Sequence, residues 1–183
     1  PSDPRYLDSL ERKLGELVAD ADSRRQSVNL GTGEGAADFN VNRRLRTPEG
    51  TVMRANPDGM VDKRVRVLRV DPVSARSAPG TLGGCPLPQS EPVAILFSYV
   101  CHATVLGHDN FRYSGDYPGA ARRFVERAYG SDEGDGTVAM FLPGCFGDVR
   151  PNLLGDDGAF RGGTDHELIV LGRLLGSEVV QAA

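Results

Sequence analysis

The segment Tyr99 to Gly119, YVCHATVLGHDNFRYSGDYPG, places a histidine directly after an apolar run with the composition of a β-strand. His102 ends that run, and the polar loop after it carries His108, Asp109 and Asp116. Imidazole and carboxylate groups that converge on one point are what a metal site needs. The segment therefore indicates a metal site with His102 as a ligand. The alternative is a structural histidine that is hydrogen-bonded to the backbone.

The other two histidines are weaker candidates. Six residues separate His102 from His108, a spacing that fits neither a helical metal pair nor a zinc finger, so we expect His108 to be a loop residue. His166 stands beside Asp165 at an expected helix start. With only three histidines in the chain, a site of three imidazoles is not expected, and other ligand types would have to complete it.

A second polar segment, PGCFGDVRPN, follows the short apolar run 137–142. If both runs are strands of one sheet, Asp148, Arg150 and Asn152 belong to the same edge as His102. Asp148 is open to two interpretations, a ligand or base and a turn residue that caps its own backbone. We expect Cys145 to be a small buried thiol, because the spacing does not match a nucleophile elbow.

Hydrophobic periodicity predicts strands near 27–30, 64–70, 92–100 and 138–142, and helices near 5–21, 117–129 and 165–181. This alternation predicts an α/β fold, a mixed sheet with flanking helices, in which residues 1–183 form a single domain or a fragment of a longer one. The strand at 92–100 is nearly all apolar, so we expect both of its faces to be covered. Residues 72–92 are rich in Pro, Gly and Ser and predict an exposed loop or hairpin tip.

Two further patterns predict packing. The first helix carries an apolar stripe at helical spacing, which we expect to be core: Tyr6, Leu7, Leu10, Leu14, Leu17, Val18 and Ala21. The segment GTGEG has Gly31, Gly33 and Gly35, which indicate a backbone that passes close to a neighbour. The glycine spacing does not match the dinucleotide-binding fingerprint.

The composition limits the class of protein. The chain has 183 residues, of which 39% are hydrophobic and 25% charged, enough for one domain with a core. A formal net charge of −4 disfavours nucleic acid as a partner. We expect no transmembrane segment, and the N-terminus has neither an initiating Met nor a signal-like apolar core, as in an excised piece. Three cysteines at irregular spacing predict no disulfide framework. Compartment and oligomeric state stay open.

Five pieces of the sequence, taken together and in order, resemble the N-terminal catalytic domain of the neutral/alkaline non-lysosomal ceramidases. They are the NR of VNRR, VRVLRVD, ILFSYVCHATVLGHDNFRYSGDYPGAA, GCFGDVRPN and LIVLGRLL, spread over most of residues 40 to 180. The resemblance implies a zinc-dependent amide hydrolase that cleaves the N-acyl bond of a lipid amide. It is compatible with a secreted protein.

The resemblance also implies roles for single residues. His102 falls on a zinc histidine, Arg43 on an active-site arginine near the scissile amide, and Asp116 on an aspartate that would orient a ring or the loop. The family's other zinc ligands, a histidine in an upstream His-x-His run and a downstream glutamate and tyrosine, have no counterpart here, so the implied zinc site is partial.

One position departs from the family pattern. Arg150 stands where the ceramidases have a serine, and a guanidinium cannot replace a hydroxyl as nucleophile or proton relay. The small-molecule or lipid amide substrate therefore stays open, and Arg150 is a candidate catalytic residue or a partner of Arg43 in binding an anionic group. The competing interpretation is a non-catalytic ceramidase-like domain that binds a ligand or a partner.

Overall fold

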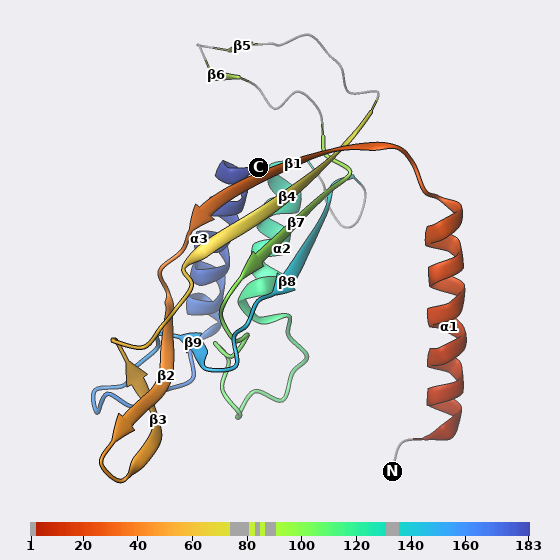
Figure 1. The fold of residues 1–183 in the computed structure, drawn as a ribbon. Coiled ribbons are helices and arrows are strands. Elements are labelled where there is room, and N and C mark those ends of the chain that lie inside the picture. The colour runs from red at the N-terminus through yellow and green to blue at the C-terminus, as the bar shows by residue number, and fades with distance from the viewer. Residues whose placement is uncertain (1–2, 74–80, 83–84, 87–90, 131–135) are drawn as a thin grey trace.

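The computed structural model describes residues 3–73, 81–82, 85–86, 91–130 and 136–183. These residues form three helices and nine strands, which confirms the α/β class (Figure 1). In chain order the elements are α1 (Pro4–Ser23), β1 (Val28–Ala36), β2 (Asn40–Thr47), β3 (Gly50–Asn56), β4 (Arg64–Pro72), β5 (Thr81–Leu82), β6 (Cys85–Pro86), β7 (Ala94–Tyr99), α2 (Asp116–Ala128), β8 (Val138–Pro143), β9 (Val149–Pro151) and α3 (Asp165–Ala182).

The main sheet has the order β1-β4-β7-β8, with β7 antiparallel to β4 and parallel to β8. It is a mixed sheet, and β7 is an interior strand, as its apolar sequence predicts. Helices α2 and α3 lie side by side along one face of this sheet (Figure 1).

The two faces of β7 are not equally covered. Ile95, Phe97 and Tyr99 are buried against the helices, whereas the alternate residues of the strand are only partly buried. On the neighbouring β8, Met140 belongs to the same open face and is 51% exposed. The expectation that both faces of the strand are covered is therefore wrong for this chain, because its two packed helices lie on the same side.

A second, three-stranded sheet with the order β3-β2-β9 was not predicted from the sequence. Strand β2 reads NVNRRLRT, in which arginine and asparagine interrupt the apolar alternation that marks a strand. It pairs with β3 as a hairpin and with β9 over three residue pairs, from Asn40 with Pro151 to Asn42 with Val149. These long-range pairings, rather than a local pattern, make the segment a strand.

Helix α1 begins where the sequence predicts, with the Asp3 carboxylate accepting the backbone N–H of Arg5. None of its residues is buried, and Leu17 and Val18 are 63% and 67% exposed. The helix stands apart from both sheets (Figure 1). The expectation that its apolar stripe is core is thus wrong in this chain, since an amphipathic period fixes a helix but not its partner. None of the described helices is both long and apolar enough to cross a bilayer.

Helix α3 makes two close approaches that require glycine. A Cβ at Gly172 would overlap the Ala120 side chain and lie 2.9 Å from the Tyr117 carbonyl oxygen, so α2 and α3 touch backbone to backbone. A Cβ at Gly33 in β1 would overlap the Ala182 carbonyl at the end of α3. The prediction that the GTGEG backbone passes close to a neighbour is confirmed, and the neighbour is a helix of the same chain.

Most of the predicted loop or hairpin tip at 72–92 lies outside the described residues, apart from the antiparallel pair β5 and β6. The apolar residues of α2 and α3 that face the core are Ala120, Ala121, Val125, Leu168, Leu175 and Val179, whereas Ala128 and Leu174 are exposed.

We predict opposite effects of alanine at two helical glycines. Gly172→Ala forces α2 and α3 apart and should lower the free energy of unfolding by about 1–3 kcal/mol. Gly15→Ala in α1 meets nothing within 4 Å, so helix propensity alone applies and the helical circular dichroism signal should stay equal or rise. Urea unfolding and circular dichroism measure both. Equal stability of Gly172→Ala and wild type would contradict the close helix contact.

Candidate functional site

His102 lies just beyond the carboxyl end of β7, at the edge where the parallel strand β8 also ends. Its backbone N–H donates to the carbonyl oxygen of Val149 in β9 at 3.0 Å. Its ring packs edge-on against Phe146, with 4.4 Å between ring centroids. The predicted meeting of the two polar segments at one sheet edge is therefore seen in the structure.

The start of α2 holds the loop that carries His102. The Asp116 carboxylate accepts the backbone N–H groups of Val105 and Leu106 at 3.2 and 3.0 Å, and that of Tyr117 at 2.8 Å. The buried Tyr117 hydroxyl donates to the Cys101 carbonyl oxygen at 2.6 Å. Asp116 thus contacts the loop, and its hydrogen bonds go to the backbone rather than to the His102 ring.

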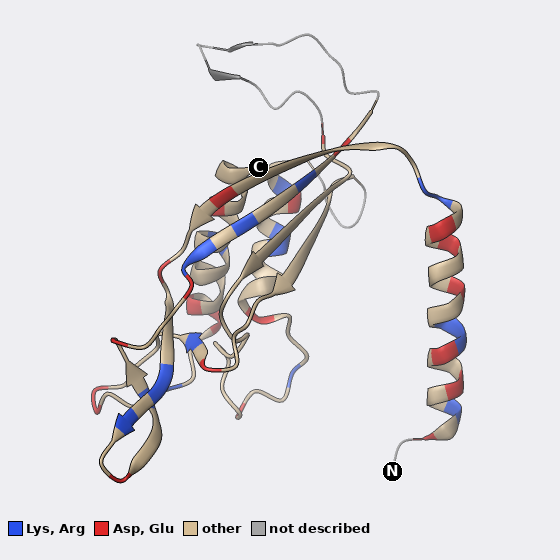
Figure 2. Ribbon diagram, viewed as in Figure 1, with Lys and Arg blue, Asp and Glu red and all other residues tan. Residues whose placement is uncertain are grey.

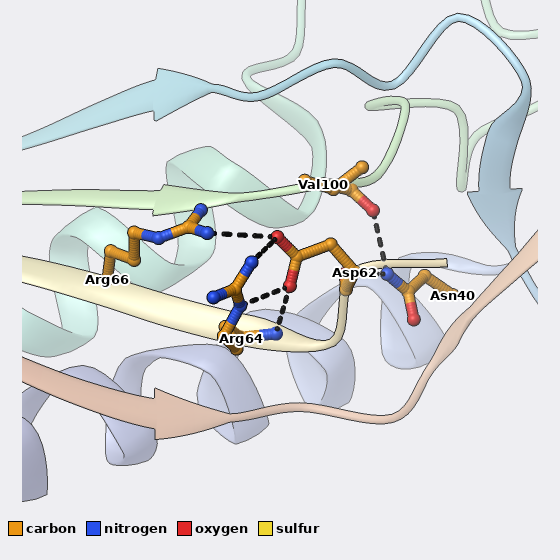
Figure 3. A network of polar contacts seen from close by, with 5 residues as sticks. All are labelled: Asn40, Asp62, Arg64, Arg66 and Val100. Carbon is orange, nitrogen blue, oxygen red and sulfur yellow. Dashed lines mark hydrogen bonds and ion pairs between the residues drawn. The ribbon is translucent and has the colours of Figure 1, made fainter. Parts of the chain in front are cut away.

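A buried amide fixes the other side of the same strand end. Asn40, which is 5% exposed, donates from Nδ2 to the carbonyl oxygens of Val100 at 2.7 Å and Asp62 at 3.1 Å (Figure 3). The Asp62 carboxylate accepts from the guanidinium groups of Arg64 and Arg66, at 2.9 to 3.1 Å, and these ion pairs hold its pKa far below the usual range. The network joins β2, β4 and the end of β7.

Arg43 of β2 reaches the His102 ring. Its Nη2 lies 3.2 Å from His102 Nε2 and donates to the Gly147 carbonyl oxygen at 2.8 Å. A guanidinium only donates hydrogen bonds, so Nε2 is the acceptor and the proton of the neutral ring is on Nδ1. Arg43 also sits opposite a register shift between β2 and β3, a type of irregularity that redirects side chains.

Arg150 of β9 lies on the same face of the small sheet. It pairs with Val41 across β2 and β9, and Arg43 is two residues along from Val41, which returns it to the same face. The Arg150 guanidinium lies over the Phe160 ring, 4.5 Å from its centroid. Its Nε is buried and has no hydrogen-bond partner among the described residues.

The charges at this site act on each other. Burial lowers the pKa of His102, and the positive charges of Arg43 and Arg150 lower it further. Burial and the charge of Arg43 likewise lower the pKa of Arg150. The imidazole is therefore neutral near pH 7, with a lone pair able to accept a hydrogen bond, a proton or a metal ion.

Asp148 and Cys145, next to this cluster, have surroundings that the sequence did not indicate. The Asp148 carboxylate accepts from Asn42 Nδ2 at 2.8 Å, which links β9 to β2 across the small sheet. Cys145 is exposed, so the expectation of a buried thiol is wrong; it lines a cavity of about 650 Å³ that Asp148 also lines. The sequence contained no indication of a role for Asn40, and it placed Asn42 only in the NR piece of the family resemblance, without a role.

The described residues do not form a metal centre by themselves. Among them, no group of three or more His, Cys, Asp or Glu side chains has the arrangement of a metal site. His108 and His166 are both exposed and stand at different elements from His102. The site of this chain is therefore a cationic pair of arginines around one neutral imidazole.

The fold is similar to part of the solved structures of neutral ceramidases. The crystal structure of neutral ceramidase from Pseudomonas aeruginosa matches with a TM-score of 0.61 and 21% identity, over 90% of this chain and 24% of that chain. A ceramidase complexed with C2 matches with a TM-score of 0.61 and 21% identity, over 88% of this chain and 23% of that chain. The chain thus spans about a quarter of the length of these neighbours. No family model matches the sequence, and no curated protein does.

The Asn40 amide gives a stability prediction. In Asn40→Asp the donor that serves two carbonyl oxygens becomes an acceptor of the same shape, and the free energy of unfolding at pH 7 should fall by at least about 1–3 kcal/mol. Urea unfolding measures the loss. The exposed Gln26, which lies outside the strands, provides the control, since Gln26→Glu should change stability by less than about 0.5 kcal/mol. Similar stability of the two variants would mean that the Asn40 bridge does not hold the strands.

The lowered pKa of His102 predicts a pH-dependent stability. Because the folded chain binds this proton less readily than the unfolded chain, lowering the pH through the ordinary histidine value of about 6.5 should destabilise the fold. His102→Gln should remove this part of the slope between pH 7.5 and 5, whereas His166→Gln should keep it. Urea unfolding at several pH values measures the slopes. Parallel profiles for His102→Gln and wild type would refute the assignment.

Proposed function

We propose that this chain is part of a ceramidase-like amide hydrolase, in which His102 and Arg43 belong to the reaction centre. The observation that carries the proposal is the 3.2 Å contact between Arg43 Nη2 and His102 Nε2 at the end of an interior strand. The two residues are 59 positions apart in the chain, and they are in contact there. The family resemblance assigns both to one active site. The similar fold of the ceramidase structures supports the same function.

Arg43 has the chemistry that amide hydrolysis requires. Addition of water to an amide carbonyl places negative charge on its oxygen, and fixed cationic donors stabilise that charge. The guanidinium of Arg43 is fixed by the Gly147 carbonyl and the imidazole, and its buried Nε–H has no acceptor among the described residues. In our proposal Arg43 binds the carbonyl oxygen of a lipid or small-molecule amide.

Zinc is the cofactor that the resemblance implies, and the described residues do not fit a complete zinc site. A tetrahedral site takes three or four protein ligands, and the described residues contain no group of three or more His, Cys, Asp or Glu side chains that could supply them. The Nε2 lone pair is also engaged by Arg43, so a metal ion at Nε2 would displace that contact. We therefore propose His102 as a single ligand contributed to a site that further polypeptide completes, and assign no step of the reaction to a metal within this chain.

A non-catalytic domain is the second candidate. The arginine at position 150, where the family resemblance implies a serine, favours it, because this position then supplies no hydroxyl nucleophile or relay. Such a domain would bind a ligand or partner at Arg43 and Arg150 and hydrolyse nothing.

The experiment that separates the two candidates uses the longest natural polypeptide that contains this chain. His102→Ala should abolish both stoichiometric zinc and hydrolysis of a long-chain N-acyl amide, while His166→Ala should change neither. Elemental analysis and release of the free amine are the two measurements. A wild-type protein that contains no zinc and releases no amine would support the binding domain. Unchanged zinc in His102→Ala would remove His102 from the ligand set.

A further inference from the structure

We propose that Arg43 and Arg150 together form a binding site for an oxyacid group, a carboxylate or a phosphate, of the substrate. The inference rests on the proposed function, since it names the substrate class of the same site. It differs from that function in placing an anionic group, beside the amide, at the face of the small sheet that carries both guanidinium groups.

The two arginines are held together by the fold. Strands β2 and β9 pair antiparallel, and the register puts Arg150 opposite Val41, with Arg43 on the same face. Each guanidinium is held by a separate contact. Arg43 donates a hydrogen bond to the Gly147 carbonyl oxygen, and Arg150 lies over the Phe160 ring. Two like charges in a partly buried position repel each other, so the arrangement favours a shared negative partner.

The chain supplies no such partner among its described residues. No described carboxylate lies within ion-pair distance of Arg43 or Arg150, and the Nε of each is buried without an acceptor. The nearby acids are engaged elsewhere: Asp116 accepts three backbone N–H groups, and Asp148 accepts from Asn42. Other arginines of this region do have acidic partners, as Arg64 and Arg66 share Asp62.

The chemistry of the ligand follows from these donors. Guanidinium groups bind carboxylates and phosphates through paired, charge-assisted hydrogen bonds, and a neutral hydroxyl or amide gives only single, weaker ones. Buried N–H groups without acceptors are costly until a ligand supplies oxygen atoms. An amide that carries an acid, such as an N-acyl amino acid or an N-acyl amine phosphate, supplies them; a neutral N-acyl amine does not.

A panel of three soluble ligands tests the proposal by calorimetry: N-octanoylglycine, N-octanoylethanolamine and its phosphate ester. The wild-type protein should bind at least one anionic ligand about ten- to a hundredfold more tightly than the neutral one, the ratio that a charge-assisted hydrogen bond provides. Arg150→Ser should reduce this ratio to near one. Arg44→Ser provides the matched control, because Arg44 is on the same strand and exposed, and it should keep the ratio.

Arg150→Lys keeps the charge without the planar fork and should give an intermediate ratio, which guards against a serine variant that fails to fold. Tighter binding of the glycine conjugate indicates a carboxylate site, and tighter binding of the ester a phosphate site. Equal binding of the neutral and anionic ligands by the wild type, or an unchanged ratio in Arg150→Ser and Arg150→Lys, would overturn the proposal.

Hydrolysis of the same ligands separates this inference from the proposed function. Preferential binding of the anionic ligand without hydrolysis of any ligand would leave the oxyacid site standing and refute the hydrolase. Hydrolysis of the neutral amide, with equal binding of the neutral and anionic ligands, would support the hydrolase and refute the oxyacid site.

Discussion

The Asn40 amide is the contact on which the geometry of the site depends. It sits at the start of β2, and its Nδ2 holds the carbonyl oxygen of Val100 at the end of β7 and that of Asp62 before β4. A buried amide that serves two backbone acceptors keeps carbonyl groups satisfied where the strand ladder ends. Through it the small sheet is fixed to the main sheet, and Arg43, three residues further along β2, is brought to His102.

The site joins two sheets rather than lying within one. His102 follows β7 of the main sheet, while Arg43 and Arg150 belong to β2 and β9 of the small sheet. The hydrogen bond from the His102 backbone to Val149 closes the junction. A change in the relative position of the two sheets would therefore separate the imidazole from both guanidinium groups. The geometry of the proposed reaction centre thus depends on this junction.

The local charge at this junction is opposite to that of the whole chain. The formal net charge is −4, yet β2 and β4 carry several basic residues (Figure 2). Those of β4 are paired with acids, while the two arginines at the site have no acidic partner among the described residues. A fold shared with ceramidases does not fix the substrate, because recognition depends on the side chains at the site. In our proposal the arginine at position 150, where the family resemblance implies a serine, changes that recognition from hydroxyl chemistry to anion binding.

The sequence by itself determined the elements whose burial has a period. Strands β1, β4, β7 and β8 and all three helices were predicted from it, because an apolar run or an apolar repeat of two or 3.6 residues belongs to each. Only the tertiary structure decided the rest. Strands β2, β3 and β9 exist through pairing across the chain, and the contact of Arg43 with His102 joins residues 59 positions apart. The stripe of α1 is not buried by the described part of the chain despite its regular spacing. Local periodicity records which side of an element is apolar, but it contains no information on which distant element lies against that side.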